Sequence, residues 1–157
     1  MRNGKYQIGL IGAGGIALDE HLPGWRALPD AEVVAAADSS DEALARARGR
    51  FAIPHTFADW RDLIRIDGLD IVDVCTPNRM HAPIAAAALV AGLHVLCEKP
   101  LTTTSAEAVM LRDAAKASGK LLMTGQHLRF KSACVRLREA ARTIGDVYYA
   151  RAHWLRR

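Results

Sequence analysis

Apolar residues fall in short runs along the chain, and longer stretches of mixed polar and apolar positions separate these runs. The runs are apolar at nearly every position, which is typical of strands buried on both faces of a parallel sheet. We therefore expect strands over residues 7–11, 32–37, 71–75, 94–97 and 121–125, and a short edge-ward strand near 55–57. Helical patterns lie between them, over residues 15–28, 41–50, 58–64, 80–91, 105–118 and 132–143.

Strands that alternate with helices are typical of a doubly wound α/β fold, with helices on both faces of the sheet. We predict a parallel sheet in the strand order 3-2-1-4-5-6. Pro23-Gly24 should break or kink the first long helix, because proline lacks a backbone N–H. Gly92 and Gly119 follow their helices, as C-terminal caps do.

The end of the chain has a different pattern. Residues 147–155 alternate imperfectly between apolar and polar, as in a strand with one solvent-facing side. We expect residues 1–130 to form the α/β domain. Residues 131–157 would then be a connecting helix and the first strand of a truncated second α/β domain. Such an uncovered strand should be disordered or pair with another chain.

Composition narrows the class of protein. The chain has 157 residues, half of them apolar, which suits one domain, and no apolar run is long enough for a membrane span. The net charge of +4 comes from scattered arginines without interleaved aromatic residues, so we expect anionic small ligands and no nucleic acid. Cys75, Cys97 and Cys134 have neither disulfide nor zinc spacing, which predicts no metal site and a reducing cytoplasm.

A glycine-rich turn follows the first strand. Gly12-Ala13-Gly14-Gly15-Ile16-Ala17 has the pattern G-x-G-x-x-A between a predicted strand and a predicted helix. Gly12 allows a sharp exit from the strand, Gly14 lets a pyrophosphate approach the backbone, and Ala17 lets the helix pack on the sheet. The helix N-terminus offers N–H groups to phosphates. We therefore expect Gly12, Ala13, Gly14, Gly15 and Ile16 to bind a dinucleotide.

A carboxylate ends the second strand. Asp38 can accept hydrogen bonds from both hydroxyls of an adenosine ribose, which favours NAD because a 2′-phosphate would be repelled. Ser39 and Ser40 bring no positive charge, although Arg46 is close enough in sequence to keep NADP possible. The alternative is an ordinary glycine turn in which Asp38 begins a loop or caps the next helix. Strand, turn, helix and acid in this order favour the dinucleotide.

Three polar segments follow the later strands. Ligands of open parallel sheets bind beyond the carboxyl ends of the strands, so these segments should line one crevice with the glycine turn. Their sequences are Cys75-Thr76-Pro77-Asn78-Arg79-Met80-His81, Cys97-Glu98-Lys99-Pro100 and Gly125-Gln126-His127-Leu128-Arg129-Phe130.

Taken together, these motifs resemble the Gfo/Idh/MocA family of oxidoreductases. The resemblance rests on G-x-G-x-x-A, the strand-end acid, T-P-N-x-x-H, A-G-x-H-V-x-x-E-K-P and the later R-F, in that order. It implies a Rossmann domain followed by an α/β domain built on a large open sheet. It also implies NAD- or NADP-dependent oxidation or reduction of a hydroxyl or carbonyl, usually on a sugar, inositol or related polyol.

The resemblance also implies roles for particular residues. Lys99 would lie in the active site, where its ammonium can hydrogen-bond the substrate oxygen and help its proton leave. Glu98 would position Lys99 or the backbone and contact the ribose on the nicotinamide side of the cofactor. The peptide bond before Pro100 can be cis, because the chain must turn sharply there. The nicotinamide half of the cofactor would pack along Thr76, Pro77 and Asn78.

Further candidates for substrate contact have alternatives. His81 could instead cap the helix that starts near Met80, and His127 and Arg129 could be plain surface residues. The resemblance places the family's catalytic histidine in the second domain, beyond Arg157, and His153 does not correspond to it. We therefore expect this chain alone to bind cofactor with little chemistry, and the full-length protein to form a homo-oligomer. The alternative function is a non-catalytic dinucleotide-binding module or sensor.

Overall fold

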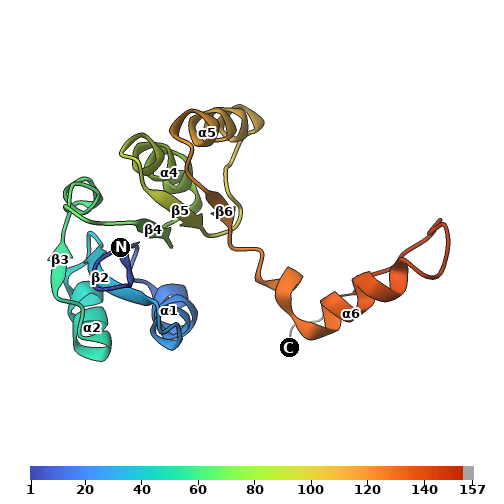
Figure 1. Cartoon of the computed structure of the whole chain (residues 1–157), viewed down its shortest axis with the longest axis horizontal. Coiled ribbons are helices and arrows are strands. Elements are labelled where there is room, and N and C mark those ends of the chain that lie inside the picture. The colour runs from blue at the N-terminus through green and yellow to red at the C-terminus, as the bar shows by residue number, and fades with distance from the viewer. Residues whose placement is uncertain (154–157) are drawn as a thin grey trace. The chain divides into compact units, whose positions relative to one another are not determined.

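Six strands form one parallel sheet in a computed structural model of the chain, which describes residues 1–153 (Figure 1). The sheet order is β3-β2-β1-β4-β5-β6, and every neighbouring pair is parallel, so the predicted fold and strand order are confirmed. The strands are β1 (Tyr6–Ile11), β2 (Ala31–Ala37), β3 (His55–Phe57), β4 (Ile71–Val74), β5 (His94–Cys97) and β6 (Leu122–Thr124).

The helices lie between the strands, close to the predicted ranges. They are η1 (Ala17–His21), α1 (Leu22–Ala27), α2 (Asp41–Phe51), α3 (Trp60–Leu63), η2 (Asn78–Met80), α4 (His81–Val90), α5 (Ser105–Ser118), η3 (His127–Phe130) and α6 (Ser132–Ala141). The longest, α5, begins with a capping box in which Thr104 and Glu107 bond each other's backbone N–H groups, and Gly119 ends it in the left-handed conformation.

The first helix differs from the prediction at Pro23. Of the predicted break or kink, the break at Pro23 does not occur, since α1 runs through Pro23 and Gly24 to Ala27. The irregularity precedes the proline instead, as a π-helical turn in which the N–H of Leu22 bonds to the carbonyl of Ala17. Pro23 is tolerated because it lies in the first turn of α1, where a backbone N–H is not needed.

Two apolar clusters lie on opposite faces of the sheet, because successive strand side chains point to opposite sides. Val72 and Val74 of β4 belong to the cluster that includes residues of α4 and α5. Leu10 of β1 and Ala36 of β2 belong to the cluster that includes residues of α1 and α2. In Figure 1, α4 and α5 accordingly lie above the strands and α1 and α2 below them.

The chain divides into two compact units, Met1–Gly125 and Gln126–Arg157. The sheet lies entirely in the first unit, while η3 and α6 belong to the second. The strand predicted over residues 147–155 is wrong over its described part, because residues 147–153 form no strand and have no partner strand to bond; residues 154 and 155 lie outside the described residues. The assignment of residues 131–157 to a second domain stays a prediction. Among the described residues, no helix combines the length and apolar character needed to cross a membrane.

Candidate dinucleotide site

A cavity of about 630 Å³ opens at the carboxyl ends of the central strands. The glycine turn after β1, the end of β2 and the segment after β4 line it. Seven of the predicted site residues are on its wall: Gly12, Gly14, Gly15, Ile16, Asp38, Thr76 and Pro77. Four others lie outside this lining: Ala13 in the glycine turn, Asn78 in the segment after β4, and Glu98 and Lys99 in the segment after β5.

The glycine turn has the geometry that a close ligand requires. Gly12 has a φ of +94°, and a Cβ there would lie 2.6 Å from the carbonyl oxygen of Cys75, so no other residue fits. A Cβ at Gly14 or Gly15 would meet nothing within 4 Å. Because both residues also line the cavity, their backbone is open to a phosphate.

Asp38 ties the glycine turn to the end of β2. One carboxylate oxygen accepts the N–H of Ala13 at 2.7 Å, and the other accepts the N–H of Ser40 at 2.9 Å. Each oxygen can accept more than one hydrogen bond, so the carboxylate keeps capacity for ribose hydroxyls. The two backbone hydrogen bonds hold the carboxylate in place, and Asp38 lines the cavity.

Thr76, on the cavity wall, has a hydroxyl group that a polar ligand could bond. Its hydroxyl oxygen is buried, and the described residues offer it no hydrogen-bond partner. An unpaired buried hydroxyl costs about 1–3 kcal/mol, so a ligand group that bonds it would be stabilised. With the open glycine turn and the strand-end carboxylate, this orphaned group fits a dinucleotide.

Sequence reasoning missed part of the cavity wall. Trp60 at the start of α3 and Arg79 in η2 both line it. Arg79 stands inside the T-P-N-R segment and could have been included with its neighbours. No signal in the sequence marks Trp60, whose ring is covered by the guanidinium of Arg61 at 4.6 Å.

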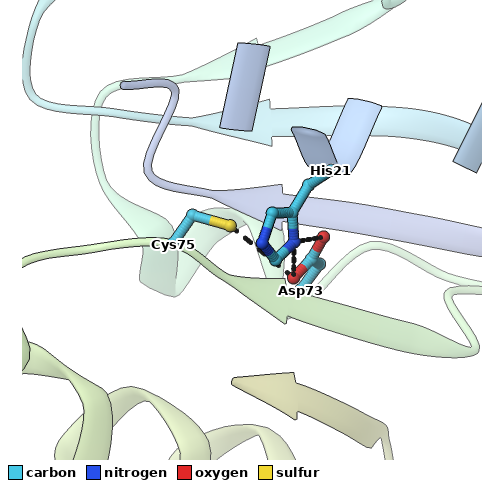
Figure 2. A group of neighbouring side chains, drawn as sticks. All are labelled: His21, Asp73 and Cys75. Carbon is cyan, nitrogen blue, oxygen red and sulfur yellow. Dashed lines mark hydrogen bonds and ion pairs between the residues drawn. The ribbon is translucent and has the colours of Figure 1, made fainter. Parts of the chain in front are cut away.

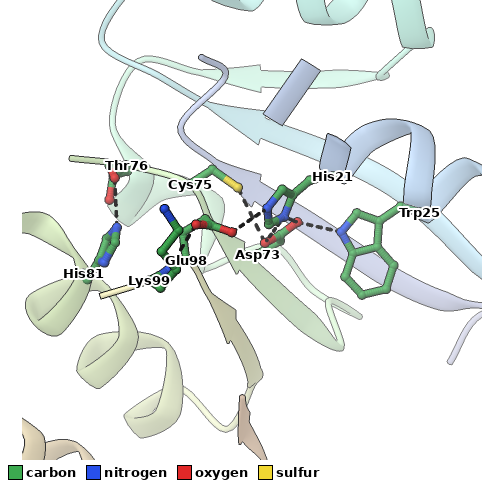
Figure 3. A network of polar contacts seen from close by, with 8 residues as sticks. All are labelled: His21, Trp25, Asp73, Cys75, Thr76, His81, Glu98 and Lys99. Atoms are coloured by element: carbon green, nitrogen blue, oxygen red, sulfur yellow. Dashed lines mark hydrogen bonds and ion pairs between the residues drawn. The ribbon is translucent and has the colours of Figure 1, made fainter. Parts of the chain in front are cut away.

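A second cluster that the sequence did not reveal surrounds His21, in η1. Its Nδ1 lies 2.9 Å from Oδ2 of Asp73, and its Nε2 lies 3.2 Å from Oε1 of Glu98 (Figure 3). Trp25 donates its indole N–H to Asp73 at 2.6 Å, and the Cys75 thiol donates to the same carboxylate at 3.7 Å. Asp73, in the middle of β4, is completely buried.

Burial and the charges in this cluster shift three pKa values, those of His21, Cys75 and Cys97. Burial of His21 lowers its pKa, but the hydrogen bond and charge of Asp73, followed by those of Glu98, outweigh it, so the pKa is raised above its ordinary value. Burial, and then the negative charges of Asp73 and Glu98, raise the pKa of Cys75 far above its ordinary range. The imidazole is therefore favoured as a cation, and the Cys75 thiol stays protonated.

His21, Asp73 and Cys75 also have the proximity of metal ligands. Their donor atoms lie within 4.8 Å of one another (Figure 2). However, the hydrogen bonds among them use these same atoms, and a protonated thiol is a poor ligand. Their arrangement is that of a hydrogen-bonded network.

His81 joins two of the predicted loops. Its ring is 1% exposed, with Nδ1 at 2.7 Å from the carbonyl oxygen of Pro100 and Nε2 at 2.8 Å from that of Thr76. The Lys99–Pro100 bond is cis, as the sequence predicted. Both ring nitrogens thus contact backbone oxygens, and the side chain does not cap α4. His81 fastens the T-P-N segment to the E-K-P segment.

The remaining candidates lie in the second unit. His127 and Arg129 are exposed residues of η3, and their role as substrate contacts stays a prediction.

Comparison with known proteins identifies the family. The Gfo/Idh/MocA family, described as an oxidoreductase family with an NAD-binding Rossmann fold, matches residues 6–126. The chain belongs to this family. The resemblance deduced from the motifs is thereby confirmed, as is the nicotinamide cofactor.

Several relatives are named as dehydrogenases of a sugar or of inositol. D-glucoside 3-dehydrogenase of Escherichia coli is 34% identical over 100% of this chain and 45% of its own length. Inositol 2-dehydrogenase 4 of Saccharopolyspora erythraea is 33% identical over 78% of this chain and 36% of its own length. The WlbA dehydrogenase of Chromobacterium violaceum, solved with NADH and UDP-GlcNAcA, has a TM-score of 0.85 at 26% identity, over 91% of this chain and 41% of that one. The chain spans less than half the length of these relatives.

Proposed function

We propose that this chain is the cofactor-binding part of an enzyme that transfers hydride between NAD and a hydroxyl or carbonyl of a sugar, inositol or related polyol. The observation that carries the proposal is the cavity, where the glycine turn, Asp38 and the orphaned Thr76 hydroxyl meet at the carboxyl ends of the strands. The names of the relatives support the substrate class.

Within this proposal, distinct groups hold distinct parts of the cofactor. The backbone of Gly12–Ile16 would bind the pyrophosphate, Asp38 the adenosine ribose, and Thr76, Pro77 and Asn78 the nicotinamide half. Glu98 would contact the nearby ribose. When bound, the nicotinamide supplies the hydride chemistry.

Lys99 is the proposed catalytic residue of this chain. It is exposed beside the cis Pro100, in a loop that His81 fastens to Thr76 on the cavity wall. An ammonium there would hydrogen-bond the substrate oxygen and stabilise its charge as the proton leaves. A substrate contact by His81, His127 or Arg129 remains open within the proposal, although neither ring nitrogen of His81 is free.

Lys99→Met in the full-length gene product tests this role. With a panel of sugars, inositols and polyols, and NADH absorbance as the signal, we expect kcat to fall by about 10²- to 10⁴-fold. NADH binding should persist, because the substitution leaves the glycine turn and Asp38 on the cavity wall unchanged. Lys116→Met, which removes an exposed ammonium from α5, is the matched control. Full activity of Lys99→Met would refute the assignment, and NADH binding without turnover of any panel member would favour a non-catalytic module.

The proposal also covers the cellular compartment and the binding partners of the protein. The three cysteines are free, which supports a reducing cytoplasm. Arginines of α2 pair with acids, Arg46 with Glu42 and Arg50 with Asp19, which supports the absence of a nucleic-acid partner. Exposed apolar side chains of the second unit, such as Tyr148, support a homo-oligomer of the full-length protein.

A further inference from the structure

A carboxylate occupies the middle of a buried central strand. Asp73 stands between Val72 and Val74 in β4 and is completely buried, on the sheet face that carries α1. A buried carboxylate is tolerated only when its oxygens are bonded and its charge is compensated. Trp25 and Cys75 supply hydrogen bonds to it, and His21 is the one cationic group bonded to it among the described residues.

The surroundings of His21 determine which hydrogens its ring carries. Nδ1 lies 3.0 Å and 2.9 Å from the two oxygens of Asp73, while Nε2 lies 3.2 Å from Oε1 of Glu98. Ionised carboxylates only accept hydrogen bonds, so both bonds form only when both ring nitrogens carry a hydrogen. The geometry therefore calls for an imidazolium that bridges two carboxylates.

Glu98 is held from its other side by the main chain of the next residue. Its Oε2 accepts the backbone N–H of Lys99 at 3.1 Å. Gly125, at the end of β6, leaves the space that the carboxylate needs, since a Cβ there would lie 2.7 Å from Oε1. A continuous chain of contacts thus runs from Asp73 through His21 and Glu98 to the backbone of Lys99 (Figure 3).

We propose that His21 is a positioning residue that orients Glu98, and through it the backbone of Lys99, by bridging Glu98 to the buried Asp73. The proposal rests on the proposed function, in which Lys99 acts on the substrate. His21 belongs to η1 and does not line the cavity, so it acts through Glu98.

The bridge is sensitive to pH. The titratable groups that face His21 are Asp73 from β4, Glu98 from the segment after β5, and the Cys75 thiol beside Asp73. Nδ1 has two close carboxylate oxygens and Nε2 has one, more distant, so the hydrogen on Nε2 is the one lost when the ring becomes neutral. Nε2 would then turn a lone pair toward Glu98, which loses its anchor. Raising the pH therefore releases Glu98 and alters the hydrogen bond of the Lys99 N–H.

Nuclear magnetic resonance of the ¹⁵N-labelled 157-residue chain without cofactor tests this coupling. The ring nitrogens of His21 and the backbone amide of Lys99 are followed together across a pH titration. We expect both to shift with one shared midpoint, above the value of about 6.5 for an ordinary histidine. Glu98→Gln should move the His21 midpoint downward, because it removes one of the two negative charges.

His21→Gln should abolish the shift of the Lys99 amide over this pH range, while the control His55→Gln, at an exposed position of β3, should leave it intact. A Lys99 amide that stays constant while the His21 ring titrates in the unsubstituted chain would overturn the proposal, even if His21→Gln does not fold. Because no cofactor is present, this result is separate from a failure of NADH binding or turnover, which would count against the proposed function instead.

Discussion

At the scale of single residues, Asp38 has two tasks. Its carboxylate anchors the glycine turn through Ala13 and the start of α2 through Ser40, and Asp38 lines the cavity, where we propose that it accepts hydrogen bonds from the adenosine ribose. Arg46, the arginine nearest to Asp38 in sequence, lies 2.6 Å from Glu42. We expect the carboxylate of Asp38 to favour NAD, because it would repel a 2′-phosphate.

Asp38→Ala should weaken NAD binding and raise the affinity for NADP relative to NAD by at least about tenfold. At an effective dielectric near 20, repulsion between two charges at ~4 Å is on the order of a few kcal/mol before screening, and the substitution removes it. Calorimetric titration with both dinucleotides at one salt concentration gives the ratio of the dissociation constants. The ratio is the relevant quantity, because losing the anchor at Ala13 weakens both.

Asp41→Ala, which removes a nearby charge that does not line the cavity, is the control and should leave the ratio unchanged. NADP binding as tight as NAD binding by the unsubstituted chain would show that Asp38 is not the ribose ligand.

The sequence predicted site residues that belong to a short motif, because the residue types at neighbouring positions identify the motif. Gly12, Gly14 and Asp38 are examples. His21 could not be predicted, since its partners Asp73 and Glu98 lie 52 and 77 positions away along the chain. The one signal was Asp73 itself, because an acid within an apolar central strand requires a compensating partner. Sequence alone does not say which residue that partner is.

At the scale of elements, apolar runs predicted five of the six strands, since burial on both faces leaves a strong pattern, and β3 was predicted only as a short edge-ward strand. The deviations have local causes. In the first helix a π-turn precedes Pro23, and residues 147–153 lack the partner strand that an extended pattern needs. The π-turn matters for the site, because it ends at His21, which joins η1 to β4 and to the segment after β5.

The contacts of His21 with Asp73 and Glu98 should make the free energy of unfolding depend on pH. The pKa of His21 is raised in the folded protein, mainly by Asp73 and then Glu98 against the effect of burial. The contribution of His21 to the free energy of unfolding is thus fully present below about pH 6.5, the pKa of histidine in the unfolded chain. It is lost as the pH rises through the pKa in the folded protein. Urea unfolding across this range should show His21→Gln to be more destabilising at pH 6 than at pH 9.

His55→Gln serves as the reference, because it removes an exposed histidine of β3. A destabilisation by His21→Gln that is the same at both pH values would mean that folding does not raise the pKa of His21, and would contradict the charged bridge.

At the scale of the whole molecule, the described chain supplies a complete sheet and its cavity, while its relatives are more than twice as long. The glycine turn, Asp38 and the T-P-N segment come from three separate strand ends, and the parallel order of the sheet brings them together. The family model that matches residues 6–126 is that of an NAD-binding Rossmann fold. Cofactor binding is therefore the central property of this chain.

A fluorescence titration with NADH, on the unsubstituted chain and on Gly14→Val, tests that property most directly. A Cβ at Gly14 would meet no protein atom within 4 Å, so unfolding in urea should be unchanged, and Gly14 lines the cavity, so we expect the valine side chain to obstruct the cofactor. NADH affinity should fall by at least about tenfold, or about 1.4 kcal/mol. Gly24→Val, at an equally open position of α1 outside the cavity, should bind NADH as tightly as the unsubstituted chain. Equal affinity for Gly14→Val, or no NADH binding by the unsubstituted chain, would contradict the account.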